Sequence, residues 1–102
     1  MPLLVMKFGG TSVADLGRIA NAAAKVRREV DRGHDVIVIV SAMAGKTNEL
    51  VGWVEQTQPL FDAREYDAVV SSGETVTAGL MALTLQGMDV PARSWAAWQV
   101  QS

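Results

Sequence analysis

Lysine, glycine and hydroxyl side chains gather near the beginning of the chain, in the run Lys7-Phe8-Gly9-Gly10-Thr11-Ser12. Adjacent glycines allow a sharp turn and let a ligand approach main-chain N–H groups that a Cβ atom would otherwise cover. The lysine adds a positive charge before the turn, and the start of a following helix would add unpaired N–H donors. This combination favours an anion, above all a phosphate group. Two glycines would equally suit an ordinary tight turn between a strand and a helix.

Two further groups of small and polar residues could face the same ligand. Ser41 follows the apolar run Val36–Val40, and Thr47 lies in the small-residue loop after it. Glu74 ends the stretch Ser71-Ser72-Gly73-Glu74, which is polar between apolar neighbours. Taken alone, Ser41 and Thr47 also suit an ordinary loop, and the serine-rich stretch suits the N-terminus of a helix.

A strand, a helix and a second strand are predicted to position the first two groups. Leu3–Met6 is continuously apolar, which is typical of a buried strand. Between Val13 and Arg32 the apolar side chains recur every three or four residues, which indicates one face of a helix. These are Leu16, Ile19, Ala20, Ala23, Val26 and Val30. Val36–Val40 consists of β-branched residues and should lie at the centre of the sheet with both faces covered.

The ends of this helix also carry signals. Ser12 with Asp15 three residues later resembles a capping box, and Gly33 suits the position after a helix. His34 lies in the polar turn that follows and is expected to be exposed. Strands joined through a helix pair in parallel, so both strands should end at the same edge of the sheet, where ligands of such folds bind.

The second half of the chain predicts helices and a third strand. A short helix capped by Thr47 or Asn48 would bury apolar residues and end at Gln58-Pro59; these residues are Leu50, Val51 and Val54. A helical stretch around 63–70 would be followed by a separate helix from Glu74 to Gln86, with Gly87 as its stop. That helix would bury Val76, Leu80 and Leu83, and Val90–Ser94 would form the third strand. The pattern predicts an α/β fold with a parallel sheet covered by helices.

Composition excludes several classes of protein. The chain has 102 residues, no cysteine and a net charge of −2, so it predicts one domain or part of one, no thiolate metal site and no nucleic-acid partner. Its longest purely apolar run, Val36–Val40, is far too short to span a membrane. No signal peptide is recognisable, so we expect a soluble, cytoplasmic protein without a membrane partner.

Two common phosphate-binding motifs are absent. The dinucleotide fingerprint requires three glycines in the pattern G-x-G-x-x-G, which the run Gly9–Ser12 does not provide. A Walker A loop ending at Gly45-Lys46-Thr47 would require a glycine at position 40, where Val40 stands. The sequence therefore disfavours an ordinary P-loop nucleotidase.

The three groups together resemble a known family. Lys7–Val13, Val40–Met43, Thr47 and Ser72–Glu74 are similar, in order and spacing, to motifs of the amino-acid kinase family. The pattern Lys-x-Gly-Gly marks the broad family, which includes acetylglutamate, glutamate and uridylate kinases. The fuller string Lys-Phe-Gly-Gly-Thr-Ser-Val with Ser-Ala-Met resembles the aspartate kinases more specifically. The resemblance covers essentially the whole chain.

The resemblance implies a fold and a set of partners. The fold would be a three-layer α/β/α sandwich with a mostly parallel sheet, and residues 1–102 would form the N-terminal part of a kinase domain that continues further. ATP would be the phosphoryl donor, with Mg²⁺ held through its phosphates and no metal ligand from this chain. L-Aspartate would be the acceptor, in the first step of lysine, threonine and methionine biosynthesis. The full-length enzyme would be a homo-oligomer, and this part alone would be inactive.

The resemblance also implies a role for each matched residue. Lys7 would be catalytic and would neutralise charge on the transferring phosphoryl group. The ATP phosphates would be held by Lys7, Phe8, Gly9, Gly10, Thr11, Ser12 and Ser41. Thr47 would contact the amino acid, and Glu74 would accept a hydrogen bond from its ammonium group. Because the attacking carboxylate is already anionic, catalysis would consist of positioning and charge stabilisation, with no general base.

Two departures and three alternatives accompany this prediction. Lys46 stands where aspartate kinases often carry an acidic or polar residue, and Ser94–Gln99 contains alanines and Trp98 where a glycine-containing stretch is common. The alternatives are another amino-acid kinase with an acyl or carbamoyl acceptor, a nucleotide sensor, and a non-catalytic module that assembles through an apolar edge. Trp95 and Trp98 motivate the last of these.

Overall fold

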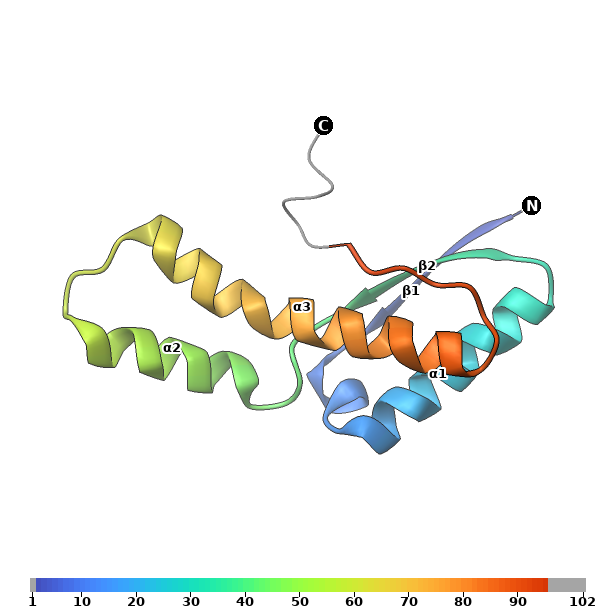
Figure 1. Cartoon of the computed structure of the whole chain (residues 1–102), viewed down its shortest axis with the longest axis horizontal. Helices are drawn as coiled ribbons and strands as arrows, with labels where there is room; N and C mark the ends of the chain where they lie inside the picture. Colours follow the sequence, from blue (N-terminus) through green and yellow to red (C-terminus); the bar gives the residue numbers. More distant parts are fainter. Residues whose placement is uncertain (1, 96–102) are drawn as a thin grey trace.

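A computed structural model describes residues 2–95 of the chain. The molecule is elongated, about 50 × 33 × 18 Å, with a sheet and two helices at one end and a helical hairpin at the other (Figure 1). Its elements are β1 (Leu3–Phe8), η1 (Gly10–Val13, a 3-10 turn), α1 (Leu16–Asp31), β2 (Asp35–Val40), α2 (Lys46–Thr57) and α3 (Ala63–Gly87). Trp98 and most of the departing segment Ser94–Gln99 lie outside the described residues.

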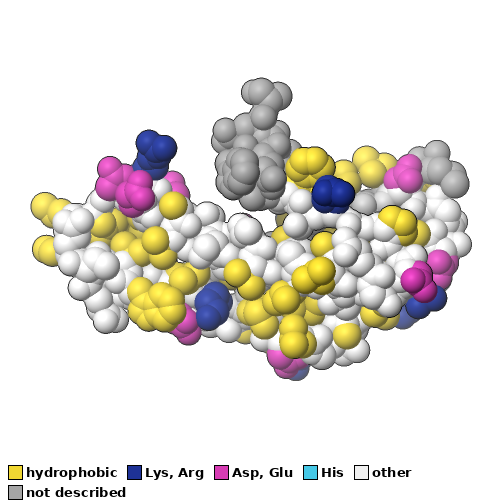
Figure 2. Space-filling view, viewed as in Figure 1, with side chains coloured by type: hydrophobic (Ala, Val, Ile, Leu, Met, Phe, Trp, Pro, Cys, Tyr) yellow, Lys and Arg dark blue, Asp and Glu magenta, His cyan; other side chains and the backbone are white. Residues whose placement is uncertain are grey.

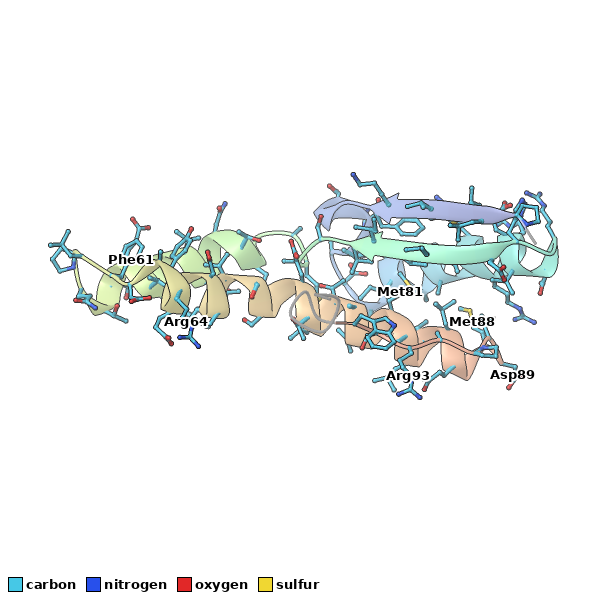
Figure 3. All side chains as sticks on the ribbon, turned by 90° about the horizontal axis from the view of Figure 1, so that it is seen from above. Phe61, Arg64, Met81, Met88, Asp89 and Arg93 are labelled. Atoms are coloured by element: carbon cyan, nitrogen blue, oxygen red, sulfur yellow. The ribbon has the colours of Figure 1, made fainter. Side chains whose placement is uncertain are left out.

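The two strands pair in parallel, as predicted, and place Lys7 opposite Ile39. One face of the sheet packs against α1 and α3, both of which lie on the same side (Figure 3). The other face is open, and Val5, Ile37 and Ile39 on it are about half exposed. The expectation that β2 is covered on both faces is therefore wrong within residues 2–95. The predicted α/β class is confirmed, and two of the three expected layers are present in the described residues.

The core lies between the covered face of the sheet, α1 and the second half of α3. Three of the residues predicted for the buried face of α1 are buried, namely Ile19, Ala23 and Val26, and Ile19 is completely buried. Ala20 and Val30 are only partly buried, and Ala22, which was not predicted, is buried. The buried set is Val13, Ile19, Ala22, Ala23, Val26, Met81, Leu85 and Val90. Leu16, predicted to belong to it, is 65% exposed because it stands in the first turn of α1, at the edge of this layer.

The start of α1 differs from the predicted capping box. Asp15 itself is the N-cap, and its carboxylate accepts a hydrogen bond from the N–H of Arg18 at 2.8 Å. Ser12 belongs to η1, which separates the glycine turn from α1. The end of α1 is as predicted, since Gly33 has a φ of 93° and donates to the carbonyl of Val30.

His34 is half-buried, so the expectation of full exposure is wrong. Its Nδ1 lies 3.3 Å from both the carbonyl and the carboxylate of Glu29, because the turn folds back onto the end of α1. Nη1 of Arg32 also lies 2.6 Å from the Glu29 carboxylate and forms an ion pair with it. This cluster closes the amino-terminal end of β2, opposite the edge where ligands are expected.

The helix α2 begins earlier than predicted. Gly45 is its N-cap with a φ of 80°, a left-handed conformation that glycine adopts without strain. Thr47 is therefore inside the first turn and does not cap the helix. Leu50 and Val54 are buried and the helix ends at Thr57, as predicted.

The helix α3 is continuous over 25 residues, so the predicted break at Ser71–Glu74 is wrong. Ser72 does not act as a cap, because its hydroxyl donates to the carbonyl of Val69 at 2.6 Å within the helix. The buried face is also different from the predicted one. It consists of Gly73, Thr77, Met81 and Leu85, whereas Val76 and Leu83 are exposed and Leu80 is only partly buried.

The end of α3 explains why the third predicted strand does not form. Gly87 is the last helical residue, and the left-handed position is taken by Asp89, with a φ of 63°. The N–H of Val90 donates to the carbonyl of Leu85, and the Gln86 side chain donates to the carbonyl of Ala92. The N–H of Val90 and the carbonyl of Ala92 are thus bonded to α3, and the sheet of the described residues has two strands.

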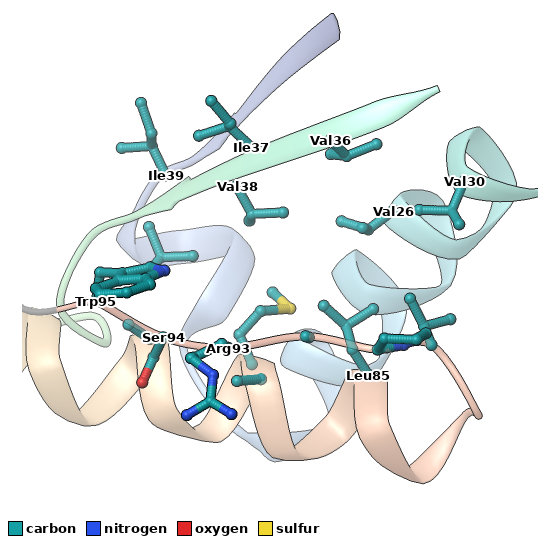
Figure 4. A pocket seen from close by; sticks show the side chains of 17 residues that line it. Val26, Val30, Val36, Ile37, Val38, Ile39, Leu85, Arg93, Ser94 and Trp95 are labelled. Atoms are coloured by element: carbon teal, nitrogen blue, oxygen red, sulfur yellow. The ribbon is translucent and has the colours of Figure 1, made fainter. Parts of the chain in front are cut away.

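A cavity of about 670 Å³ separates β2 from the segment 90–95. Val36 and Val38 point toward it, whereas Ile37 and Ile39 project from the opposite side of the strand (Figure 4). Trp95 lies below the carboxyl end of β2 in this view. None of the predicted site residues lines this cavity, so it is not the crevice that the sequence pattern indicated.

By length and composition alone α3 could cross a membrane. It also carries Glu74 at its middle and packs against both α1 and α2, and its central polar residue Thr77 is completely buried. We therefore interpret its apolar character as that of a core helix.

Candidate functional site

Lys7 lies on the open face of the sheet at the carboxyl end of β1. It alternates with the inward-facing Met6 and Phe8, and its side chain is exposed. None of the four ion pairs found among the described residues includes Lys7. Its ammonium group is therefore open to solvent at the edge of the sheet, and its role toward an anionic ligand stays a prediction.

The two glycines of the turn differ in what surrounds them. Gly9 has an extended conformation, with φ −77° and ψ 174°, and a Cβ built on it meets no atom within 4 Å. Neither backbone strain nor packing in the described residues requires a glycine there, and its open side leaves room for a ligand. A Cβ on Gly10 would lie 3.1 Å from the carbonyl oxygen of Ala42 and 3.6 Å from Ala44. Gly10 therefore brings the turn against the loop that follows β2.

Thr11 and Ser12 lie in η1 with exposed side chains. The N–H of Ser12 donates to the carbonyl of Gly9 at 3.0 Å, which closes the turn. The guanidinium group of Arg18 donates to the carbonyl of Thr11 at 3.3 Å and ties the turn to α1. The backbone groups of both residues thus take part in the turn, and the role of their side chains toward a phosphate stays a prediction.

Ser41 and Phe8 join the two strand ends. The N–H of Ser41 donates to the carbonyl of Phe8 at 3.1 Å and extends the ladder past β2. The ring of Phe8 packs against the core, so only its backbone lies at the edge of the sheet. The half-buried side chain of Ser41 stands at this edge next to Ala42.

Gly73 places α3 against the same loop. A Cβ on Gly73 would lie 2.9 Å from the Cβ of Ala42 and 3.3 Å from the Leu50 side chain. Its neighbour Glu74 is exposed and one helical turn before Ala78, which lines the cavity under β2. Residues four apart share a helix face, so Glu74 lies on the same face of α3 as Ala78. Its place near the loop after β2 follows from its neighbour Gly73, which packs against Ala42.

Thr47 is exposed in the first turn of α2. The preceding residue, Lys46, pairs with Glu49 at 3.0 Å, and its Cγ would lie 3.4 Å from a Cβ on Gly73. The contact between the start of α2 and the middle of α3 therefore brings Thr47 and Glu74 to one end of the helical hairpin. The charge of Lys46, a departure from the family pattern, is partly compensated by Glu49.

Ala42 is the residue that the sequence reasoning missed. It is 5% exposed and lies between Gly10 and Gly73, at the point where the turn after β1, the loop after β2 and α3 meet. It lies within the string Ser41-Ala42-Met43, but it carries no polar group, so no role was assigned to it. The available signal was size, because all three positions hold Gly or Ala.

No group of three or more carboxylate or imidazole side chains that could hold a metal ion occurs in the described part of the chain. The features that suit ATP phosphates are the available Lys7 charge and the open space beside Gly9.

Comparison with known proteins gives one family. The sequence model described as "Amino acid kinase family" matches residues 2–102. An "Aspartokinase" of Rickettsia felis is 48% identical over 98% of this chain and 26% of that protein, and an "Aspartokinase" of Pseudomonas aeruginosa is 46% identical over 99% and 24%. The chain thus spans about a quarter of the length of these relatives.

A solved structure agrees with the sequence comparisons. The crystal structure of aspartate kinase from Synechocystis superposes with a TM-score of 0.83 and 40% identity, over 87% of this chain and 15% of that chain. The fold predicted from the sequence is therefore the fold of the structural neighbour. With a family match over almost its full length, the chain belongs to the amino acid kinase family.

Proposed function

We propose that this chain supplies part of the active site of an aspartate kinase. The enzyme transfers the γ-phosphoryl group of ATP to the side-chain carboxylate of L-aspartate, giving 4-phospho-L-aspartate and ADP at the start of lysine, threonine and methionine biosynthesis. The observation that carries the proposal is the meeting of three elements at Ala42. This contact supports the proposal because it joins the phosphate-type turn, through the loop after β2, to Gly73 of α3, the residue next to Glu74, while Lys46, the residue before Thr47, also lies close to Gly73.

The donor side of the reaction is assigned to the end of β1. Lys7 stabilises the negative charge of the phosphoryl group as it moves, and the N–H groups beside Gly9 and Gly10 hold the phosphates. Thr11 and Ser12 support this turn, and Ser41 lies beside the transferring group. Mg²⁺, bound through the phosphate oxygens, offsets further negative charge.

The acceptor side is assigned to the hairpin. Glu74 accepts a hydrogen bond from the α-ammonium group of aspartate, and Thr47 contacts the amino acid. A carboxylate oxygen of the aspartate side chain forms the new bond to phosphorus while the bond between the γ-phosphorus and the ADP oxygen breaks. The attacking group is already an anion, so the residues act by bringing together two groups that repel each other.

The direct test uses the complete reading frame that carries these residues. Acyl phosphate would be trapped as a hydroxamate with ATP, Mg²⁺ and either aspartate, glutamate, acetylglutamate or carbamate as acceptor. We expect turnover with aspartate only. Turnover with another acceptor would move the enzyme elsewhere in the family, and nucleotide binding without any turnover would indicate a sensor.

A matched pair of lysine variants tests the role of Lys7. Lys7→Met should lower kcat by about a hundredfold or more and leave the fold intact, because the side chain is exposed and outside the ion pairs of the described residues. Lys25→Met, on the exposed side of α1, removes the same charge away from the site and should leave kcat unchanged. Equal effects of the two substitutions would contradict the assignment.

The open face of the sheet leads us to expect that the 102-residue chain associates with itself. Leu3, Val5, Ile37 and Ile39 expose a contiguous apolar surface around Lys7. We expect this chain on its own to lack turnover and to associate through that face, since such surfaces are rarely left uncovered in monomers. Sedimentation would show an assembly larger than 10.9 kDa, whereas a stable monomer would contradict this expectation.

A further inference from the structure

The loop after β2 is hydrogen-bonded to the sheet on one side and packs against α3 on the other. On the sheet side, the N–H of Ser41 donates a hydrogen bond to the carbonyl of Phe8. The carbonyl oxygen of Ala42 lies so close to Gly10 that a Cβ added there would be 3.1 Å from it. On the helix side, the methyl group of Ala42 faces Gly73, where a Cβ would come within 2.9 Å. Real Cβ atoms do not approach so closely, so one additional methyl group at position 73 must push α3 and the loop apart.

The helix is the part that would move. The loop is anchored to β1 and β2 by the strand ladder, whereas α3 contacts α2 around Gly73 and joins the core cluster only at Met81 and Leu85. A shift of α3 carries Glu74, the next residue, away from the edge of the sheet. The turn at Gly9 and Gly10 would stay in place, because its contact with Ala42 is made through the backbone.

We propose that Gly73 is a positioning residue: its contact with Ala42 sets the distance between the phosphate-side turn and the acceptor-side Glu74. This inference rests on the proposed function, from which the roles of the two sides are taken. It adds that acceptor geometry is controlled by close packing of a helix on a loop, without any polar contact at position 73.

The substitution Gly73→Ala has a matched control in Gly79→Ala. Both place alanine inside α3, where the helix gains about the same intrinsic stability. A Cβ at position 79 meets no atom within 4 Å, so only Gly73→Ala introduces the close contact. In the complete protein, Gly73→Ala should raise the KM for aspartate about tenfold or lower kcat to a similar degree, with the KM for ATP changed less than about twofold. Gly79→Ala should leave all three constants unchanged.

The compensating variant is Ala42→Gly combined with Gly73→Ala, which moves the methyl group across the contact. This double variant should recover most of the lost kcat/KM for aspartate. If Gly73→Ala alone does not fold, the double variant is the one on which the proposal is tested. Absence of recovery, or equal changes in the KM values for ATP and aspartate, would overturn the proposal.

Thermal unfolding of the same variants separates this proposal from the proposed function. The changes in melting temperature caused by Ala42→Gly and by Gly73→Ala should not add up in the double variant, because substitutions of residues in contact are energetically coupled. A protein that shows this coupling but no aspartate phosphorylation would refute the proposed function and keep the packing contact. A protein with activity but additive effects at positions 42 and 73 would refute the positioning role alone.

Discussion

The two ends of the molecule are built with different amounts of core. The sheet half, which comprises β1, β2, α1 and the second half of α3, contains the whole buried cluster around Ile19. The hairpin half, which comprises α2 and the first half of α3, buries chiefly Leu50 and Val54. Hydrophobic side chains remain visible along the outer surface of this half and over α3 (Figure 2).

This difference separates the two roles of the proposed site. The phosphate-side turn belongs to the well-packed half, whereas Thr47 and Glu74 belong to the half with few buried contacts. Segments with few buried contacts open at lower free energy than a core does. The donor side should therefore be rigid, and the acceptor side should be the part that adjusts to substrate.

The largest expected effect comes from Ile19→Ala. Ile19 is completely buried in the sheet half, and removal of its side chain should cost about 2–5 kcal/mol of unfolding free energy. Urea unfolding should show one transition in which both halves are lost together. A cost below about 1 kcal/mol would contradict the location of the core.

Leu50→Ala should weaken the hairpin half selectively. Leu50 lies beside Gly73, where an added Cβ would come within 3.3 Å of its side chain, and it is 7% exposed. The expected cost is about 2 kcal/mol, at the low end for buried leucine. Native-state hydrogen exchange should accelerate in α2 and the first half of α3 while β1 and β2 keep their protection. Equal acceleration in both halves would remove the distinction between them.

The aromatic pair at the tip of the hairpin should contribute less. The rings of Phe61 and Tyr66 stack with centroids 5.2 Å apart and planes 19° from parallel. A double-mutant cycle with alanine at both positions should give a coupling of about 0.5–1.5 kcal/mol. A coupling near zero would show that the tip is not ordered by this contact.

The smallest expected effect is a stabilisation of the sheet half. Asp89 has a φ of 63°, a left-handed conformation that aspartate adopts more readily than most residues but glycine adopts without steric cost. Asp89→Gly should therefore raise the unfolding free energy by less than about 1 kcal/mol. The midpoint of urea unfolding should rise, and exchange in α2 should not change. Destabilisation would mean that the Asp89 side chain makes a contact that outweighs this strain.

The sequence predicted elements whose signals are local. Continuous apolar runs gave both strands, the strand–helix–strand order gave their parallel pairing, and Gly33 gave the end of α1. The glycine turn was placed correctly because a strand end, two glycines and a helix start follow one another. These features depend on residues within a few positions of each other.

The middle of α3 could not be predicted in this way. Serine is common at helix N-termini, so Ser71–Glu74 indicated a start, but inside the helix the hydroxyl of Ser72 bonds back to Val69. Glycine inside a helix costs about 1 kcal/mol, and here the close approach to Ala42 gives a reason for it. The same contact selects a buried face with Gly73 and Thr77 and leaves Val76 outside. Only the tertiary structure contains this information.

Amide hydrogen exchange of the complete protein tests the central claim most directly. It would be measured without ligand, with ADP and Mg²⁺, and with aspartate. The two-sided site requires nucleotide to protect the amides of Gly9–Ser12 and aspartate to protect the residues around Thr47 and Glu74. Protection of both regions by one ligand alone, or of neither region by either ligand, would contradict the division of donor and acceptor roles between the two halves.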